Sequence, residues 1–304
     1  MRKFKNKFKM LHLILSLSIV LSGCGINSLD LFGNNIENSS EDALTVRFID
    51  AGQGDCELLT FPDGTVMLID GGDRFCSNYI VDYLEDCGVE EIDFLVATHP
   101  HSDHIGGLDD VLESIPVSEV IMPRISESDI PTTQTYEDFL IAVKNSGCKV
   151  TAAKRGLSVY EGDNTSIKLL APCEDNYSDL NGYSAVVKVQ YGEKSFLFTG
   201  DADKESEEEM LLTGDDLSAD VLKVGHHGSS TSTTDEFLDA VNPDYAIISV
   251  GVDNKYGHPH LETLEKLKAG NTEVYTTADS GTVTAVCDGE NIEFSFSRNN
   301  IYEP

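Results

Sequence analysis

The amino-acid sequence predicts an α/β protein, a four-layer α/β/β/α sandwich in which two sheets pack face to face and helices cover both outer surfaces. The chain has 304 residues, enough for one large domain with an extensive core. Its two halves are each rich in strand-like segments followed by helical ones, and no linker separates them. Clusters of His and Asp follow apolar strand-like segments in both halves, so the ends of these strands are expected to meet at one edge of the sandwich.

The first 23 residues have the features of an export signal. Five basic residues lie within positions 1–9, and the mostly apolar stretch over 10–22 is too short for a comfortable membrane span. The sequence Leu-Ser-Gly-Cys that ends at Cys24 resembles a bacterial lipobox, in which the cysteine becomes the lipid-modified first residue of the mature protein. An ordinary signal peptide or an uncleaved anchor is the alternative. We therefore expect an exported protein that is lipid-anchored to the outer face of a bacterial cell membrane.

Residues 24–43 are rich in Asn, Ser and acids and show little periodicity, which predicts a flexible tether before a single domain over 44–304. The mature chain is strongly acidic. Removing residues 1–23 takes away five of the 21 basic residues and none of the 53 acidic ones, which leaves a net charge of about −37. Such a surface excludes a nucleic-acid binder that depends on a basic groove.

Six cysteines follow Cys24, at irregular spacings and with no Cys-x-x-Cys pair. This pattern argues against a structural zinc site or a thioredoxin-like site. We expect buried thiols in most cases, although one or two disulfides are compatible with an exported chain.

The first half begins with strands. Apolar and β-branched residues predict strands over 44–50, 56–61 and 65–70, with the turn Pro-Asp-Gly between the last two. A helix is expected over 78–87, followed by an apolar strand over 92–98 that leads directly into a histidine-rich segment. Short strands and helices then alternate to about residue 151, with a helix over 136–146.

The second half repeats this organisation. A hairpin is expected from strands over 184–191 and 194–199, joined at Gly-Glu. Further strands are predicted over 220–224 and 245–250, and helices over 203–212, 235–241 and 260–269. Three strands, over 273–276, 282–287 and 292–296, complete the predicted elements.

The segment over 98–107 predicts a metal site. It places His99, His101, Asp103 and His104 within six positions, and imidazole and carboxylate groups are typical ligands of divalent ions. The other histidines beyond residue 24 lie only in two further glycine-flanked pairs, at 226–227 and 258–260. Asp201 also follows an apolar strand. Because histidines that merely pack would be scattered, this clustering indicates a metal centre built from several loops.

On these motifs, the chain resembles hydrolases of the metallo-β-lactamase fold, and more narrowly the hydrolase domain of ComEC-type DNA-uptake proteins. The resemblance runs in family order through residues 49–55, 68–72, 98–107, 198–203, 222–229 and 256–260. It implies two divalent metal ions, Zn²⁺ or Mn²⁺. The first ion would be bound by His99 and His101, the second by Asp103 and His104, and Asp201 would bridge them.

One position departs from the wider superfamily. A further histidine ligand is expected shortly before Asp201, but residues 180–184 read Leu-Asn-Gly-Tyr-Ser, as in the ComEC-like branch. Either His226 or His227 completes the ligand set, or one metal binds weakly with an added water. We assign His226 to the metals and His227 to catalysis, and His258 is a ligand or a nearby acid.

The resemblance implies metal-assisted hydrolysis, in which two ions activate a water and stabilise charge on a phosphate or carbonyl oxygen. Asp103 or His258 would orient the water or protonate the leaving oxygen. Six other residues are expected to support the ligands, cap turns or contact substrate: Asp50, Asp70, Asn181, Ser184, Lys223 and Ser229. Ordinary loop hydrogen bonding is the alternative for Ser229.

The sequence therefore favours a membrane-tethered phosphodiesterase or nuclease with a phosphoester substrate, which includes DNA. The alternatives are a cell-envelope esterase of the phosphorylcholine or teichoic-acid type, and a lipoprotein that only binds metal or nucleic acid. A β-lactam hydrolase is less favoured, because the resemblance lies outside the lactamases proper. The identity of protein partners is not encoded in any motif.

Overall fold

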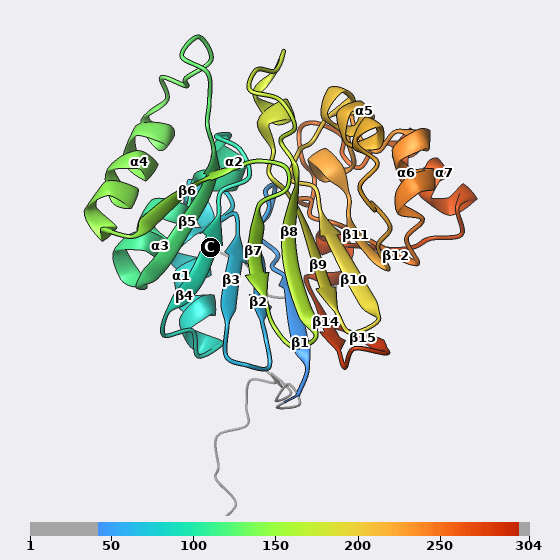
Figure 1. The fold of residues 1–304 in the computed structure, drawn as a ribbon, viewed down its shortest axis with the longest axis horizontal. Helices are drawn as coiled ribbons and strands as arrows, with labels where there is room; N and C mark the ends of the chain where they lie inside the picture. Colours follow the sequence, from blue (N-terminus) through green and yellow to red (C-terminus); the bar gives the residue numbers. More distant parts are fainter. Residues whose placement is uncertain (1–41, 298–304) are drawn as a thin grey trace, which may run out of the picture. The chain divides into compact units, whose positions relative to one another are not determined.

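The computed structural model describes residues 42–297, which form a sandwich of two sheets with helices on both outer faces (Figure 1). The four-layer architecture predicted from the sequence is confirmed. The predicted signal peptide over 1–23, the lipidation residue Cys24 and the tether up to residue 41 lie outside the described residues. Within the described part, no helix has the length and apolar character needed to cross a membrane.

The first sheet has eight strands in the order β15-β14-β1-β2-β3-β4-β5-β6. These strands are β1 (Leu44–Phe48), β2 (Glu57–Thr60), β3 (Val66–Ile69), β4 (Ile92–Val96), β5 (Val117–Pro123), β6 (Lys149–Ala153), β14 (Thr282–Cys287) and β15 (Ile292–Ser297). The strands from β3 to β6 run parallel, whereas the others pair antiparallel.

The second sheet has seven strands in the order β13-β12-β11-β10-β9-β8-β7. These strands are β7 (Ser158–Glu161), β8 (Thr165–Ala171), β9 (Val186–Tyr191), β10 (Lys194–Phe198), β11 (Val221–Lys223), β12 (Tyr245–Ile248) and β13 (Glu273–Thr276). Here the strands from β10 to β13 run parallel. In both sheets, the parallel strands therefore deliver the loops at their carboxyl ends to one edge.

Helices cover the outer face of each sheet. The first sheet is covered by the helices that precede β7, namely α1 (Ser77–Asp86), α2 (Ser102–Ile105), α3 (Leu108–Ser114) and α4 (Gln134–Ser146). The second is covered by α5 (Lys204–Thr213), α6 (Asp235–Val241) and α7 (Leu261–Ala269). The shorter elements are α8 (Thr277–Ser280) and the 3₁₀ turns η1 (Arg74–Cys76), η2 (Leu180–Tyr183) and η3 (Gly225–Gly228).

Local signals explain where the helices begin and end. The Thr133 hydroxyl accepts a hydrogen bond from the Tyr136 backbone N–H at the start of α4, and Gly147 ends that helix in the left-handed conformation, with φ 70°. Thr234 caps α6 in the same way, through the N–H of Phe237. The apolar residues of these helices, such as Phe139 in α4 and Phe237 in α6, are buried against the sheets.

Apolar side chains fill the space between the sheets. Phe48 from the first sheet stacks on Phe198 from the second, with ring centroids 5.8 Å apart, and both side chains are buried. Complete burial of one such ring stabilises the fold by about 1.5–3 kcal/mol. This layer fixes the two sheets relative to one another, so loops from both halves are held together at the shared edge.

The structure differs from the predicted elements in several places, of which two bear on the site and the sheets. The first strand ends at Phe48 rather than at residue 50, because residues 49–55 leave the sheet and run beside the histidine-rich loop. Strands β7 and β8 had no individual prediction, since β7 has only four residues and neither sequence shows a clear alternation. All six cysteines between residues 42 and 297 are free thiols, so the described chain contains no disulfide.

Candidate metal centre

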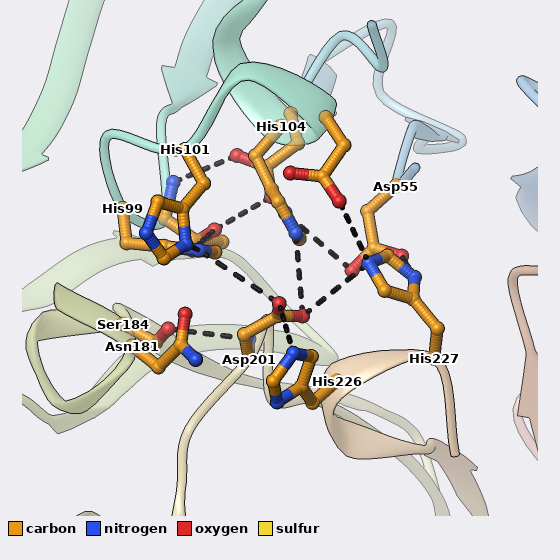
Figure 2. A network of polar contacts seen from close by, with 12 residues as sticks. Asp55, His99, His101, His104, Asn181, Ser184, Asp201, His226 and His227 are labelled. Carbon is orange, nitrogen blue, oxygen red and sulfur yellow. Dashed lines mark hydrogen bonds and ion pairs between the residues drawn. The ribbon is translucent and has the colours of Figure 1, made fainter. Parts of the chain in front are cut away.

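Three loops at the carboxyl edge of the sheets carry the ligands of the candidate site (Figure 2). The loop after β4 carries the first histidine cluster, the loop after β10 carries Asp201, and the loop after β11 carries His226 and His227. The backbone N–H of Ala185 donates to the Thr98 carbonyl across 2.9 Å, which joins the edges of the two sheets beside these loops.

The approach of residues 49–55 to the histidine-rich loop is unusually close. The Asp55 backbone N–H donates to the Asp103 carbonyl over 3.1 Å, and the Gly72 N–H donates to the Asp55 carbonyl over 2.8 Å. A Cβ atom at Gly54 would lie only 2.4 Å from the Asp103 carbonyl oxygen. Glycine is therefore required at position 54, because any side chain would push the two loops apart.

Three buried histidines each direct Nδ1 toward an acceptor in the protein. His104 Nδ1 lies 2.7 Å from an Asp70 carboxylate oxygen, His227 Nδ1 lies 2.9 Å from the Ser249 carbonyl, and His99 Nδ1 lies 3.1 Å from the Thr98 hydroxyl. Since Thr98 donates its own hydroxyl proton to Asp70, its oxygen accepts from His99. These contacts place a proton on Nδ1 in all three rings and leave Nε2 as the atom that can bind a metal once it carries no proton.

The Nε2 atoms converge on Asp201, which lies at the centre of the cluster in Figure 2. One Asp201 oxygen lies 3.2 Å from His104 Nε2 and 3.8 Å from His227 Nε2, and the other lies 3.8 Å from His99 Nε2. On the far side, His99 Nε2 lies 2.9 Å from His101 Nδ1. Ligands that each stand about 2.0–2.2 Å from a zinc ion are separated by similar distances.

The donors fall into two sets around Asp201. The first set is His99, His101 and Asp201, and the second is Asp103, His104 and His227; within each set the ligand atoms lie within 4.8 Å of one another. In the second set, His227 Nε2 lies 3.4 Å from an Asp103 oxygen. The clusters of His and Asp thus fit the binding of divalent metal ions.

Unpartnered buried atoms support this conclusion. His104 Nε2, His227 Nε2 and one oxygen of Asp201 are buried and have no hydrogen-bond partner within the described chain. Buried polar atoms are almost always paired, because an unpaired one costs about 1–3 kcal/mol. All three atoms face the same small volume, which a cation would fill.

Charges around the site shift the pKa values of its groups in opposite directions. Burial alone would lower the pKa of His227, but the Asp201 and Asp55 carboxylates outweigh it and raise that pKa to about 10. Burial would also lower the pKa of His104, but nearby carboxylates outweigh it and raise that pKa well above its usual value. In contrast, burial together with the neighbouring His104 holds the pKa of His99 well below its usual value.

Backbone conformation at the site is strained. His226 and His227 both adopt the left-handed region, with φ values of 50° and 53°, and Asp70 does so with φ 56°. Non-glycine residues in this region carry a cost of about 1–3 kcal/mol each and are held there by surrounding structure. The strain turns the two consecutive histidines in different directions, so that only one ring enters the buried cluster.

The structure places the ring of His227, rather than that of His226, within the ligand sets. The Nε2 atom of His226 approaches Asp201 to 3.6 Å, and its Nδ1 lies 3.1 Å from the Thr231 hydroxyl. The side chain of His226 is 25% exposed, whereas that of His227 is 2% exposed. The geometry therefore favours exchanging the roles predicted from the sequence, with His227 as ligand and His226 at the entrance.

His258 stands beside these histidines but lies outside both ligand sets. Its ring lies 5.6 Å from that of His226 and 6.3 Å from that of His227, and its Nδ1 is buried without a partner. Burial and the neighbouring imidazoles lower its pKa to about 4, so the ring is neutral at pH 7. His260 accepts the Ser230 backbone N–H at its Nδ1 and precedes α7, as expected for a residue at a helix start.

The expected supporting residues take several positions. Asp70 accepts hydrogen bonds from Thr98 and contacts His104, which places it directly behind the ligands. Ser184 accepts the Asp201 backbone N–H over 3.2 Å, and Asn181 lies beside it with a buried, unpartnered side-chain oxygen. Lys223 is fully buried and pairs with Asp55.

Asp50 and Ser229 make hydrogen bonds within their own loops. The Asp50 carboxylate accepts the Gly52 N–H over 3.2 Å, which is a turn-capping contact, and burial raises the pKa of Asp50 to about 6. The hydroxyl of Ser229 is buried and lies 3.0 Å from that of Thr231, so it is engaged within its own loop.

Sequence reasoning gave no individual role to Asp55, Thr98 or the Ser249 carbonyl. Asp55 was recognisable only as part of the glycine-rich segment before β2. Thr98 and Ser249 each follow an apolar strand, which is a weak signal. Their contribution depends on hydrogen bonds between distant segments, which no local pattern reveals.

Comparison with known proteins agrees with this geometry. Residues 49–252 match the family model of the metallo-beta-lactamase superfamily. Among curated proteins, the chain is 32% identical over 255 residues to ComE operon protein 3 of Bacillus subtilis, covering 78% of this chain and 32% of that protein. It is also 32% identical over 242 residues to competence protein ComA of Neisseria gonorrhoeae, covering 79% and 32% respectively.

The chain thus spans about a third of the length of these two relatives. Solved structures show the same fold at low identity. CmlA, described as a diiron beta-hydroxylase from Streptomyces venezuelae, aligns with a TM-score of 0.53 at 16% identity, over 82% of this chain and 55% of that one. The metallo-beta-lactamase fold protein YhfI from Bacillus subtilis aligns with a TM-score of 0.50 at 14% identity, over 79% and 99%. Because the family match covers more than half of the chain and includes the loops that carry His99 to His104, Asp201, His226 and His227, the chain belongs to the metallo-beta-lactamase superfamily and is related to the competence proteins.

Proposed function

We propose that this protein is a metal-dependent phosphodiester hydrolase that uses two divalent ions. The observation that carries the proposal is the position of Asp201 between two sets of donors, with the unpartnered Nε2 atoms of His104 and His227 facing its carboxylate. His99 and His101 would hold one ion, and Asp103, His104 and His227 the other. When bound, such ions supply a water of lowered pKa and neutralise charge on a phosphate oxygen.

The surrounding residues are suited to positioning a substrate at this centre. His226 and His258 lie at the entrance, next to the ligands but outside the two sets. As a neutral imidazole, His258 can accept a hydrogen bond and orient a water or a substrate hydroxyl. The Asn181 side-chain oxygen, which has no partner in the described chain, is a further polar group near Asp201.

Phosphodiesters are favoured over carboxylic esters by the similarity to competence proteins, although the acidic composition of the chain opposes an anionic substrate. A chain with a formal net charge of −32 repels anions over most of its surface, so a phosphate would be held chiefly by the two cations. The similarity to competence proteins favours DNA as one such substrate. Binding that depends on the metals predicts a shallower salt dependence than that of a nuclease with a basic groove.

The test is turnover of a panel of substrates by purified protein after chelation and reloading with Zn²⁺, Mn²⁺ or Mg²⁺. We expect hydrolysis of bis(p-nitrophenyl) phosphate and cleavage of DNA only after reloading, and loss of both in His99→Ala. The matched control is His260→Ala, which removes a histidine that lies outside both ligand sets and whose ring contacts Ser230. Turnover of a carboxylic ester, thioester or lactam, with every phosphodiester left intact in all metals, would replace this proposal by the envelope-esterase function.

We further propose that the protein is exported and held at the membrane through a lipid on Cys24. The basic and apolar composition of residues 1–22 and the Leu-Ser-Gly-Cys sequence support this location. Fractionation of cells that express the full chain tests it. A protein found entirely in the cytosolic fraction would contradict the proposal.

A further inference from the structure

A buried ion pair lies directly behind the second set of donors. The Lys223 ammonium contacts a carboxylate oxygen of Asp55, and both side chains are 1% exposed. Lys223 ends β11, two residues after Val221, whose side chain lies in the apolar layer between the sheets. Because alternate residues of a strand face the same side, Lys223 also points into this layer. It is the one lysine between residues 42 and 297 that is buried.

Such a pair is costly to bury. Removing an ammonium and a carboxylate from water costs several kcal/mol per ion, and replacing both by apolar groups of similar volume is often neutral for stability. A buried pair is therefore weak evidence for a purely stabilising role. The position of this ion pair next to the metal ligands indicates a role in metal binding.

Asp55 faces the rear of two ligand imidazoles. One of its carboxylate oxygens lies 3.3 Å from His227 Nδ1, and the other lies 3.7 Å from His104 Nδ1. Both Nδ1 atoms carry a proton, so the negative carboxylate of Asp55 faces two N–H groups. This interaction increases the electron density at Nε2, the atom that would bind the metal. The backbone of Asp55 is fixed by its hydrogen bonds to Asp103 and Gly72, which holds the carboxylate in place.

Without its lysine, Asp55 would itself be a metal ligand candidate. It belongs to two further clusters of donors, one with Asp201 and His227 and the other with Asp70 and His104, in which the ligand atoms lie within 4.8 Å of one another. The oxygen nearer His227 has no hydrogen-bond partner in the described chain. The Lys223 ammonium neutralises the charge of Asp55, which a metal ion would otherwise neutralise.

We propose that Lys223 holds the Asp55 carboxylate in place behind His227 and His104, where its negative charge supports both imidazoles. The ion pair thereby keeps Asp55 from becoming a ligand. As a result, the second ion binds on the side of Asp103. Lys223 and Asp55 are positioning residues in this scheme, because both act through the imidazoles. The inference rests on the metal centre of the proposed function, but not on its substrate.

Metal binding by full-length variants tests this role. Lys223→Met leaves the Asp55 charge without its partner, Asp55→Asn leaves the ammonium without its partner, and the double variant removes both charges while preserving size. Each protein is stripped with chelator and titrated with Co²⁺, and its visible absorption spectrum, ion stoichiometry and circular dichroism are recorded. Lys194→Met is the matched control, because Lys194 pairs with Asp220 at the other end of the adjacent strand β10.

We expect the double variant to fold and to bind its first Co²⁺ as the parent does, with affinity for the second ion lower by about 10–100-fold. In Lys223→Met, the Co²⁺ spectrum should change, since the freed Asp55 carboxylate would enter the coordination sphere. If either single variant fails to fold, the double variant still decides the question.

A folded double variant that binds both ions with the affinity and spectrum of the parent would overturn the inference, since the pair would then be structural only. An equal loss in Lys194→Met would overturn it as well. A parent that binds two ions but hydrolyses no phosphodiester would contradict the proposed function alone. A parent that binds fewer than two ions would contradict both.

Discussion

The imidazole of His104 is anchored to Asp70, with Nδ1 2.7 Å from a carboxylate oxygen and both side chains completely buried. The same carboxylate accepts the backbone N–H and the hydroxyl of Thr98, over 2.7 and 2.6 Å. One aspartate therefore fixes the orientation of a histidine ligand and the end of the strand that precedes the histidine-rich loop.

Replacing Asp70 by Asn should weaken metal binding without removing a ligand. Asn tolerates the left-handed backbone at this position, but its amide cannot accept three hydrogen bonds as the carboxylate does. We expect a loss of about 10–100-fold in affinity for one of two ions, by competition with a chromophoric chelator. Unchanged affinity in a folded variant would show that His104 needs no such support.

His226 and His227 should respond differently to truncation. His227→Ala removes a donor of the second set and should lower the bound metal from two ions to one per chain. His226→Ala should leave two ions bound and mainly reduce turnover, because this ring stands at the entrance. Elemental analysis after gel filtration distinguishes them, and the opposite pattern would restore the assignment of His226 as the ligand.

Metal binding should release protons, chiefly at the second set. The pKa of His227 is raised to about 10 and that of His104 lies well above its usual value, so both rings are protonated at pH 7 before a metal displaces the proton from Nε2. His99, whose pKa is lowered, is already neutral and releases none. Calorimetric titrations with Zn²⁺ in two buffers of different ionisation enthalpy measure this release. Equal proton release for both ions, or none, would contradict the predicted asymmetry.

Glu207 should make the fold less stable as the pH rises. Its carboxylate accepts hydrogen bonds from Thr233 and Thr234, but burial raises its pKa from 4.5 to about 7. Because the folded state binds this proton more tightly than the unfolded state, its contribution to stability is largest below pH 4.5 and is lost by about pH 7, a change of at most about 3 kcal/mol.

Urea unfolding of Glu207→Gln and the parent between pH 4.5 and 8 tests this linkage. The stability of the variant should fall less over this range, while the exposed Glu208→Gln should follow the parent. Parallel curves for all three proteins would show that Glu207 titrates normally.

Cys24→Ser should abolish lipid attachment. The prediction follows from the residues that precede Cys24, which match the requirement for small side chains before a lipidated cysteine. Metabolic labelling with a fatty-acid analogue checks it in cells that express each full-length chain. Label on the variant, or none on the parent, would rule out lipidation at this residue.

The fold was predictable because its main signals are local. Apolar strands that end shortly before His99 and Asp201, and helices with capping residues such as Thr234, can be read from the chain itself. The cluster from His99 to His104 identified a metal site for the same reason, since its donors lie within one short loop. Weak strands such as β7 have no strong pattern and depend on pairing with β8.

Which of two adjacent histidines enters the cluster was not predictable. His226 and His227 have the same side chain, the same flanking glycines and nearly the same φ, and only the tertiary position of Asp103 and Ser249 distinguishes them. Asp55 was missed for a related reason, because its importance comes from Lys223, which lies far away in the sequence.

The pairing of β1 with β14 constrains how this domain folds during synthesis. Strand β1 is bordered by β2 on one side and by β14 on the other, in register from Leu44 with Cys287 to Phe48 with Val283. During synthesis, one edge of β1 therefore stays unpaired until nearly the whole chain has emerged, and contacts of such long range form slowly. A fragment that stops before β14 would expose an apolar strand edge and tend to aggregate, so truncation from the C-terminal side is expected to fail well before it reaches any residue of the metal centre.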